Sequence, residues 1–252
     1  MGTVVSDPAG IYCGSECTHG YPVGTSITLN ASPVSGSLFA GWSGDCTGTA
    51  TCTLVMNSAL NVTANFDFVS FADVPGTNWA ANYITAIYDD GLTKGCGNGN
   101  YCPKDLVTRE QMAAFLVRAI EGDPAANYCG GNPPFNDVSP GAWSCGHIKR
   151  LVELKITLGC GGGNYCPNRQ VTREQMAVFI VRALEGDPAE NYCGGVAPFV
   201  DVSPSSWSCG HIKRLVELGI TQGFPGNEYR PNADVNREQM AAFLARAFLD
   251  MD

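Results

Sequence analysis

One sequence unit occurs three times in this chain at a constant spacing of 64 residues, and this repetition constrains the fold more than any other feature of the sequence. Two motifs recur in the same register. They are Phe-x-Asp-Val, at Phe71, Phe135 and Phe199, and Arg-Glu-Gln-Met, at Arg109, Arg173 and Arg237. Because both motifs keep one spacing, the copies are duplicated structural units. We expect three repeats, over residues 69–123, 133–187 and 197–252.

Each repeat is predicted to contain two helices joined by a glycine-rich loop. The first helices follow a tryptophan, over residues 79–90, 143–154 and 207–218. The second helices carry apolar side chains at steps of three and four, which is typical of a helix with one buried face. They are expected to begin at the capping residues Thr108, Thr172 and Asn236. Gly122 and Gly186 are expected to end the first two of them. Connectors rich in Pro and Gly follow, over residues 123–134 and 187–198.

Residues 1–68 have a different pattern, in which polar and apolar side chains alternate in short runs. Residues 26–30 and 61–66 alternate in this way, as half-buried strands do, and residues 39–42 form a further short run. A domain boundary is expected near residues 67–70. The fold class is therefore predicted as α+β, with a small β-rich domain followed by a mainly α module of three repeats.

The twelve cysteines are even in number and repeat their spacing, which predicts disulfides formed in an oxidising compartment. Two cysteines of the glycine-rich loop are lost together in the third repeat, where Phe224 and Arg230 replace them. Joint loss indicates that such cysteines bond to each other. The expected pairs are Cys96–Cys102, Cys160–Cys166, Cys129–Cys145 and Cys193–Cys209. In the β-rich domain we favour Cys13–Cys17 and Cys46–Cys52, with crossed pairings still open.

Metal, nucleotide and catalytic sites find little support in the sequence. Zinc is disfavoured because no Cys-x-x-Cys knuckle exists and the chain has three histidines. His147 and His211 are expected to be exposed helix residues, and His19 a loop residue. Gly-Lys-Ser/Thr, Gly-x-Ser-x-Gly, His-Glu-x-x-His and EF-hand patterns are absent. We therefore expect no cofactor, no metal and no enzymatic activity.

Composition limits the partners. The formal net charge of −9 argues against nucleic acid, which is bound through clustered Lys and Arg. No apolar run approaches the roughly 20 residues of a membrane span. The start, Met1-Gly2-Thr3, shows no basic and apolar leader, so we interpret the chain as a mature or truncated form.

The repeat motifs resemble a known family. Phe-x-Asp-Val, a tryptophan, a glycine-rich turn ending in Pro, and Val-Thr-Arg-Glu together resemble the S-layer homology module, and the likeness covers residues 69–252. The third loop, residues 223–231, is the most similar. The amino-terminal motifs Cys-Gly-x-x-Cys, Phe-x-Gly-Trp-x-Gly and Val-Thr-Ala-Asn-Phe resemble the divergent InlB B-repeat, a β-grasp domain of bacterial surface proteins.

This resemblance implies a fold and a ligand. Such modules act in threes, with pseudo-threefold symmetry and grooves between repeats that bind cell-wall polysaccharide, often with pyruvate ketals. It implies three kinds of ligand-binding residue in each repeat. They are Arg109, Arg173 and Arg237; Asp73, Asp137 and Asp201; and Trp79, Trp143 and Trp207. Two departures from the family pattern are Gln111, Gln175 and Gln239 at the usual glutamate position, and Asn236 in place of threonine.

Physical chemistry gives these residues two alternative roles. An arginine in the first turn of a capped helix lies where N–H groups favour an anion, and its guanidinium can grip a carboxylate through two hydrogen bonds. A tryptophan beside it offers an apolar face for a sugar. Alternatively, each arginine pairs with an aspartate to lock repeats together, the tryptophans anchor the core, and the aspartates organise turns.

We expect an extracellular protein of the cell surface or envelope that anchors non-covalently by binding an anionic polysaccharide, of which a pyruvylated polymer is one form. The alternative is a self-assembling structural subunit of a surface layer, sheath or extracellular fibre.

Overall fold

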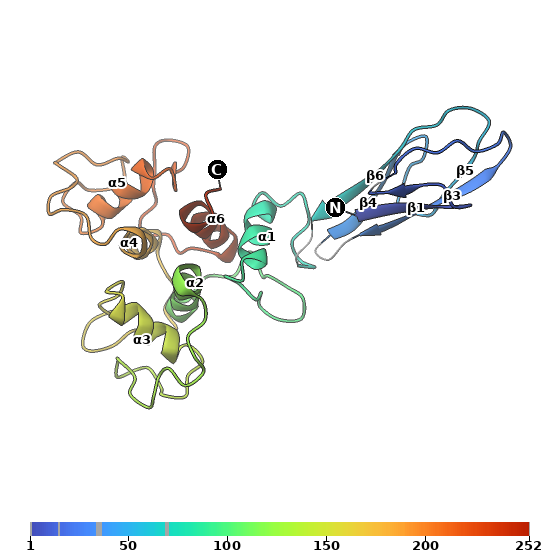
Figure 1. Cartoon of the computed structure of the whole chain (residues 1–252). Helices are drawn as coiled ribbons and strands as arrows, with labels where there is room; N and C mark the ends of the chain where they lie inside the picture. Colours follow the sequence, from blue (N-terminus) through green and yellow to red (C-terminus); the bar gives the residue numbers. More distant parts are fainter. Residues whose placement is uncertain (1, 15, 34–36, 69–70, 252) are drawn as a thin grey trace. The chain divides into compact units, whose positions relative to one another are not determined.

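The computed structural model describes residues 2–14, 16–33, 37–68 and 71–251 (Figure 1). Their contacts divide the chain into two compact parts, Met1–Thr85 and Ala86–Asp252. We call these the β-rich part and the helical part. The division falls inside a helix, whereas the boundary expected near residues 67–70 lies partly outside the described residues.

The β-rich part contains two antiparallel sheets. Its strands are β1 (Gly2–Asp7), β2 (Tyr12–Cys13), β3 (Ser26–Pro33), β4 (Ser37–Gly44), β5 (Cys52–Val55) and β6 (Val62–Phe68). One sheet has the order β2-β1-β3-β5, and β4 pairs with β6 in the other. The inward side chains Ile27, Leu29, Trp42 and Cys52 form its core. The indole Nε1 of Trp42 donates to the Ala50 carbonyl at 2.9 Å, which satisfies the polar atom of a buried aromatic ring.

Within residues 71–251 the structure describes six helices, two for each repeat, as the sequence predicted. They are α1 (Ala81–Asp89), α2 (Arg109–Glu121), α3 (Cys145–Glu153), α4 (Arg173–Leu184), α5 (Cys209–Glu217) and α6 (Arg237–Phe248). In Figure 1, α3 packs on α2 and α5 on α4. The first helix of each repeat begins two residues after the tryptophan, so that each tryptophan lies in the preceding turn. None of the helices in the described ranges has the length and apolar character that a bilayer crossing requires.

Side-chain caps fix where the second helices begin. Thr108 accepts a hydrogen bond from the Gln111 amide, and Gln111 Oε1 accepts one from the Thr108 amide in return. Asn236 and Gln239 form the same reciprocal pair at α6. These capping boxes confirm the expected helix starts, because each satisfies two amides that a helix terminus leaves without partners.

A ring of backbone hydrogen bonds joins the three repeats. Val107 N donates to Val235 O, Val235 N to Val171 O, and Val171 N to Val107 O, each at 2.9 Å. Every repeat therefore gives one bond and accepts one, which is the pattern of a pseudo-threefold axis. The equivalent Met112, Met176 and Met240, one from each second helix, are all fully buried.

All six expected disulfides form. The pairs are Cys13–Cys17, Cys46–Cys52, Cys96–Cys102, Cys129–Cys145, Cys160–Cys166 and Cys193–Cys209. Where the third repeat lacks the loop cysteines, the guanidinium of Arg230 lies 4.3 Å from the centre of the Phe224 ring. A cation–π contact thus replaces the covalent link of the other two loops.

Candidate functional site

Each second helix begins with a repeat arginine. These three arginines are buried, with an exposed fraction of 4–5%. Arg109 Nε donates to the Tyr165 carbonyl of the next repeat at 2.8 Å, and the Tyr165 hydroxyl donates back to the Arg109 carbonyl at 2.8 Å. The same reciprocal pair joins Arg173 to Tyr229 and Arg237 to Tyr101. Each arginine therefore holds two neighbouring repeats together through the main chain.

Aromatic rings enclose the guanidinium groups. That of Arg109 lies 4.8 Å from the centre of the Tyr165 ring and 5.3 Å from that of Phe179. Burial lowers the pKa of Arg109 and raises the pKa of Tyr165 well above its usual value. An arginine nevertheless remains charged at neutral pH, so this cation is compensated by carbonyl dipoles and ring faces.

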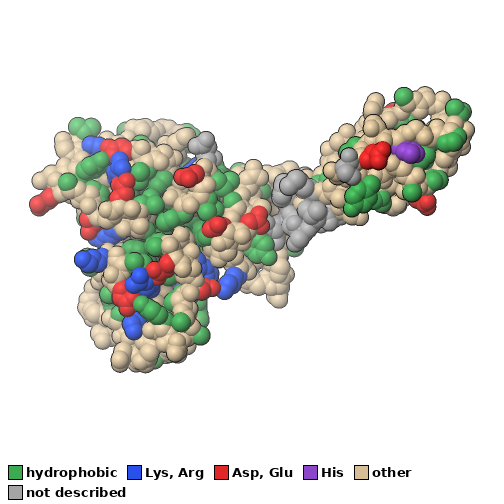
Figure 2. All heavy atoms as spheres, viewed as in Figure 1, with side chains coloured by type: hydrophobic (Ala, Val, Ile, Leu, Met, Phe, Trp, Pro, Cys, Tyr) green, Lys and Arg blue, Asp and Glu red, His purple; other side chains and the backbone are tan. Residues whose placement is uncertain are grey.

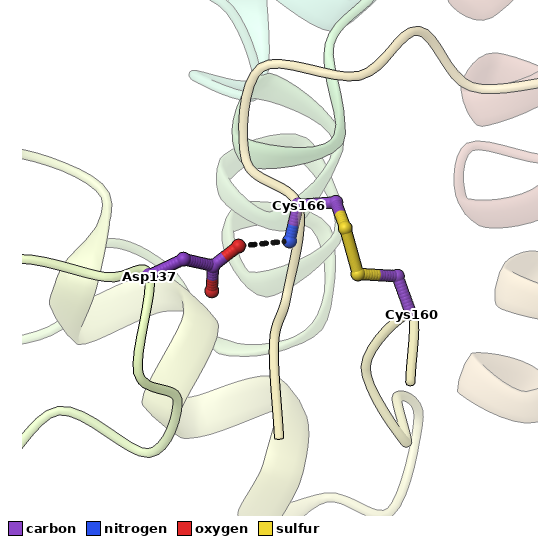
Figure 3. A group of neighbouring side chains, drawn as sticks. All are labelled: Asp137, Cys160 and Cys166. Carbon is purple, nitrogen blue, oxygen red and sulfur yellow. Dashed lines mark hydrogen bonds between the residues drawn. A yellow bond between two sulfur atoms is a disulfide. The ribbon is translucent and has the colours of Figure 1, made fainter. Parts of the chain in front are cut away.

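The Phe-x-Asp-Val aspartates organise the glycine-rich loops. Asp137 accepts the amide protons of Tyr165 and Cys166, each at 2.7 Å, as Figure 3 shows for Cys166. Asp201 does the same for Tyr229 and Arg230. The turn-organising alternative is thus the observed role of these two carboxylates, and they are not the hydrogen-bond partners of Arg109 and Arg173. A ligand contact by Asp73, Asp137 or Asp201 stays a prediction.

One cluster has the spacing of a metal site. Asp137, Cys160 and Cys166 bring their ligand atoms within 4.8 Å of one another. Figure 3 shows that the two sulfur atoms form a disulfide. Metal binding by cysteine requires thiolates, so the oxidised cluster does not suit zinc.

The repeat tryptophans are exposed, and the alternative that they anchor the core is wrong. Trp79 is 55% exposed, Trp143 56% and Trp207 61%. Each precedes its helix within a turn, so the buried face of that helix begins further along the chain. An exposed indole leaves a large apolar surface in contact with water, which is unfavourable in free energy. Its exposure therefore favours a binding role.

Trp207 lines a groove of about 320 Å³ that is built from all three repeats. Arg109 of the first repeat contributes to it, as do Arg169, Gln175, Phe179 and Arg182 of the second. Its volume falls within the range of about 300–1,000 Å³ that is typical of ligand sites. The groove therefore brings together a repeat arginine and a repeat tryptophan. That they bind a ligand stays a prediction.

Two polar groups in this groove lack protein partners. Arg169 is exposed and forms no ion pair or side-chain hydrogen bond within the described ranges. The Oε1 atom of Gln175 is buried without a hydrogen-bond partner, although Gln111 and Gln239 use the same atom in their capping boxes. Burying an unsatisfied polar atom costs about 1–3 kcal/mol. Of the two groups, the exposed Arg169 is the one that a ligand can reach.

The three repeats differ at the position of Arg169. The residue 64 positions earlier is Asp105, and the residue 64 positions later is Ala233. At this position, a cation is present only in the groove next to Trp207. Sequence reasoning missed Arg169 because it sought residues that recur in every repeat. Gln175 does recur, but it was noted only as a departure from the family pattern and was given no binding role.

His147 and His211 are buried, with 7% and 8% exposure, so the expectation that they are exposed was wrong. Their Nε2 atoms lie 2.9 Å from Asp123 and Asp187, respectively. The connector that carries each aspartate is tied to the helix by a disulfide and covers the histidine. Helical periodicity alone does not reveal such a cover. His19 is exposed in a loop, as expected.

These histidines should make the fold less stable in weak acid. Burial lowers the pKa of His147 and His211 below the ordinary 6.5, by more than their hydrogen bonds to aspartate raise it. As the pH falls through about 6.5, the unfolded chain therefore binds protons that the folded chain does not. We expect the melting temperature to fall between pH 7.5 and 5, and to fall less in a His147→Gln/His211→Gln variant. A melting temperature that rises over this range in the unmodified chain would contradict the prediction.

The comparisons with known proteins agree with the two resemblances. The S-layer homology domain family matches residues 70–113, 134–177 and 198–241, which together exceed half of the chain. The divergent InlB B-repeat domain family matches residues 3–70.

Similar proteins include surface-layer proteins and enzymes. The chain is 27% identical over 209 residues to the surface-layer 125 kDa protein of Lysinibacillus sphaericus, a match that covers 81% of this chain and 17% of that protein. It is 29% identical to the S-layer protein sap of Bacillus anthracis, a match that covers 70% of this chain and 21% of that protein. It is 34% identical to an endoglucanase of Bacillus sp. (strain KSM-635), a match that covers 69% of this chain and 18% of that enzyme. The chain thus spans about a fifth of the length of these relatives. Three family matches in one register, over more than half of the residues, show that the chain belongs to the S-layer homology family of cell-surface proteins.

Proposed function

We propose that this chain anchors non-covalently to the bacterial cell envelope by binding an anionic cell-wall polysaccharide. The observation that carries the proposal is the groove in which Arg169 lies with the exposed Trp207 and the buried Arg109. Arg169 has no ion-pair partner among the described residues. Basic and acidic side chains are interspersed on the face of the helical part in Figure 2. The proposed attraction for an anion therefore depends on the cations of the groove, Arg169 and Arg109.

The chemistry of the groove suits a carboxylate on a sugar ring. A guanidinium binds a carboxylate through two parallel hydrogen bonds, and a hydrogen bond to a charged group contributes about 1.5–3 kcal/mol. The indole of Trp207 offers a flat apolar face to the C–H groups of the sugar or to the methyl group of a ketal. A pyruvate ketal meets both requirements.

The other repeat residues extend the same proposal. Arg173 and Arg237, with Trp79 and Trp143, occupy the family positions equivalent to Arg109 and Trp207. If further grooves engage the same polymer, the second contact becomes intramolecular and the overall affinity increases. The role we propose is non-enzymatic, because the enzymes among the relatives match over a small share of their length.

Self-assembly is the second candidate, and the surface-layer proteins among the relatives favour it. In that case exposed surface such as the tryptophans would contact other copies of the chain. Electron microscopy of the purified chain without polysaccharide tests this candidate. Ordered sheets or filaments would support assembly, and dispersed particles would count against it.

Arg169→Ala tests the anchoring proposal. Ala233 occupies the same position in the third repeat, so the substitution is compatible with the fold. We expect it to weaken binding to purified Bacillus licheniformis cell-wall polysaccharide about tenfold or more, in line with the loss of a charge-assisted contact. Binding is measured by co-sedimentation and by calorimetry.

Two controls make this test specific. Lys155→Ala removes an equal charge from an exposed residue outside the groove and should leave binding unchanged. Methyl esterification of the polymer's carboxyl groups should abolish binding of the unmodified chain. The anchoring proposal is wrong if the Arg169→Ala variant and the unmodified chain bind the untreated polymer equally well.

A further inference from the structure

Strand β6 of the β-rich part has an unpaired edge. It forms a two-stranded sheet with β4, and no other described strand belongs to that sheet. Ala64 of β6 stands opposite Trp42 of β4. The Trp42 amide donates to the Gly48 carbonyl at 2.8 Å, so it points away from β6. In an antiparallel ladder both residues of such a pair direct their main-chain groups outward. The N–H and C=O groups of Ala64 therefore face the open edge of β6.

The alternation of the ladder assigns the neighbouring residues. The Asn61 carbonyl accepts from the Asp45 amide at 2.9 Å, on the β4 side of the strand. Because main-chain direction alternates from one residue to the next, Thr63 also bonds toward β4, whereas Val62 faces the open edge. The outward groups of Val62 and Ala64 have no main-chain partner in the ranges that the structure describes. Unpaired groups of this kind are a template to which another strand can add.

An apolar cavity of about 530 Å³ lies along this edge. Five consecutive residues, 60–64, line it. The side chains of a strand alternate between its two faces, so an unbroken run indicates that the cavity reaches the main chain at the edge. Leu29 and Trp42 of the core line the interior, and Val62 and Ala64 are half-buried beside them. The edge therefore offers hydrogen bonds together with apolar surface that is incompletely covered.

Both the cavity and the strand beside it are uncharged. The residues that line the cavity include no Asp, Glu, Lys or Arg, and residues 60–66 are Leu, Asn, Val, Thr, Ala, Asn and Phe. Residues 1–68 contain no Lys or Arg, and the visible face of this part in Figure 2 shows acidic side chains without basic ones. Natural sheets commonly place lysine or proline on exposed edges to prevent edge-to-edge association. The edge of β6 thus suits an uncharged, apolar strand.

We propose that two copies of this chain pair through β6, edge to edge and antiparallel, with Ala64 opposite Ala64 of the second copy. Strand β6 is itself such an uncharged strand, and each copy offers the same edge, as a twofold contact requires. In this register Val62 stands opposite Phe66 of the second copy. Side chains that are directly opposite lie on one face of a sheet, so the apolar face of each β6 extends over the cavity of the other copy.

This pairing goes beyond anchoring and does not depend on it. A twofold contact uses the same edge on both copies and is therefore closed, unlike the open assembly of a surface layer. The pair carries two helical parts. If both engage one polymer, the second binding event becomes intramolecular and the overall affinity increases.

Thr63→Lys tests the pairing, and Thr53→Lys is the matched control. Both threonines are exposed, and each lies on an edge strand, β6 or β5. Across the twofold contact the two substituted residues at position 63 are diagonal neighbours on one face, so their charges repel each other. By analytical ultracentrifugation we expect the full chain to form dimers as its concentration rises. Thr63→Lys should increase the dissociation constant about tenfold or more, and Thr53→Lys should leave it unchanged.

Amide hydrogen exchange, measured by NMR on the full chain, locates the contact. Raising the protein concentration should slow exchange at Val62 and Ala64, whose amides face the open edge. The amide of residue 63 bonds toward β4 and should exchange slowly at every concentration. In the two lysine variants the same amide shows whether β6 is still folded.

The proposal is overturned if the unmodified chain remains monomeric, in which case the edge stays open or serves another partner. It is also overturned if Thr63→Lys associates like the unmodified chain, if Thr53→Lys weakens association equally, or if exchange at Val62 and Ala64 does not depend on concentration. Arg169→Ala, the variant that tests anchoring, should leave association unchanged. Pairing and anchoring can therefore fail independently of each other.

Discussion

Replacing Arg109 with alanine should lower the free energy of unfolding of the helical part by about 3–5 kcal/mol. The substitution leaves the Tyr165 carbonyl without its donor inside the protein, at a cost of about 1–3 kcal/mol. It also removes the cation that packs between the Tyr165 and Phe179 rings, a contact that contributes about 2 kcal/mol when desolvated. Urea denaturation followed by far-UV circular dichroism measures the change.

Arg169→Ala is the matched control for this measurement, because Arg169 is exposed and its side chain has no bonded partner in the described ranges. It should change stability by no more than about 0.5 kcal/mol. Tyr165→Phe should destabilise by an intermediate amount, since it removes the return hydrogen bond but keeps the ring. If Arg109→Ala unfolds at the same urea concentration as the unmodified chain, the reciprocal Arg–Tyr pair does not hold the repeats together.

A structural role for Arg109 does not remove it from the binding proposal. Its Nε and Nη2 atoms donate to the carbonyls of Tyr165 and Gly159, yet the side chain also lines the groove. A cation fixed in this way contributes positive potential to a ligand without having to be ordered on binding. Arg169 supplies the exposed charge, which is why we chose it to test binding separately from folding.

Repetition explains how much of the fold could be predicted from the sequence. The 64-residue register revealed the helix pairs, and the caps at Thr108 and Asn236 follow from local residue preferences. Joint loss of two cysteines in the third repeat identified the loop disulfides. All of these features are local or recur in every copy, so comparison of the copies was sufficient.

Contacts between repeats could not be predicted by comparing the copies of the repeat in the sequence. The buried Tyr165 exchanges two hydrogen bonds with Arg109, which lies 56 residues away in sequence. His147 is covered by a connector whose path depends on the Cys129–Cys145 disulfide. Arg169 is a position at which the copies differ. A search for differences at structurally equivalent positions would have identified it, but equivalence becomes meaningful only when the groove is known.

Removing the two connector disulfides should destabilise the helical part more than any single substitution discussed above. Cys129–Cys145 and Cys193–Cys209 each join residues 16 positions apart. In the chain-entropy model a loop of this length stabilises the fold by about 3 kcal/mol, so the two together contribute about 6 kcal/mol. Typical domains have a total stability of about 5–15 kcal/mol. We therefore expect a variant with all four cysteines changed to serine to be largely unfolded at 37 °C, as measured by circular dichroism.

A Cys46→Ser/Cys52→Ser variant is the control, because that disulfide lies in the β-rich part and should leave the helical transition unchanged. Cooperative melting of the four-serine variant at the temperature of the unmodified chain would refute the prediction.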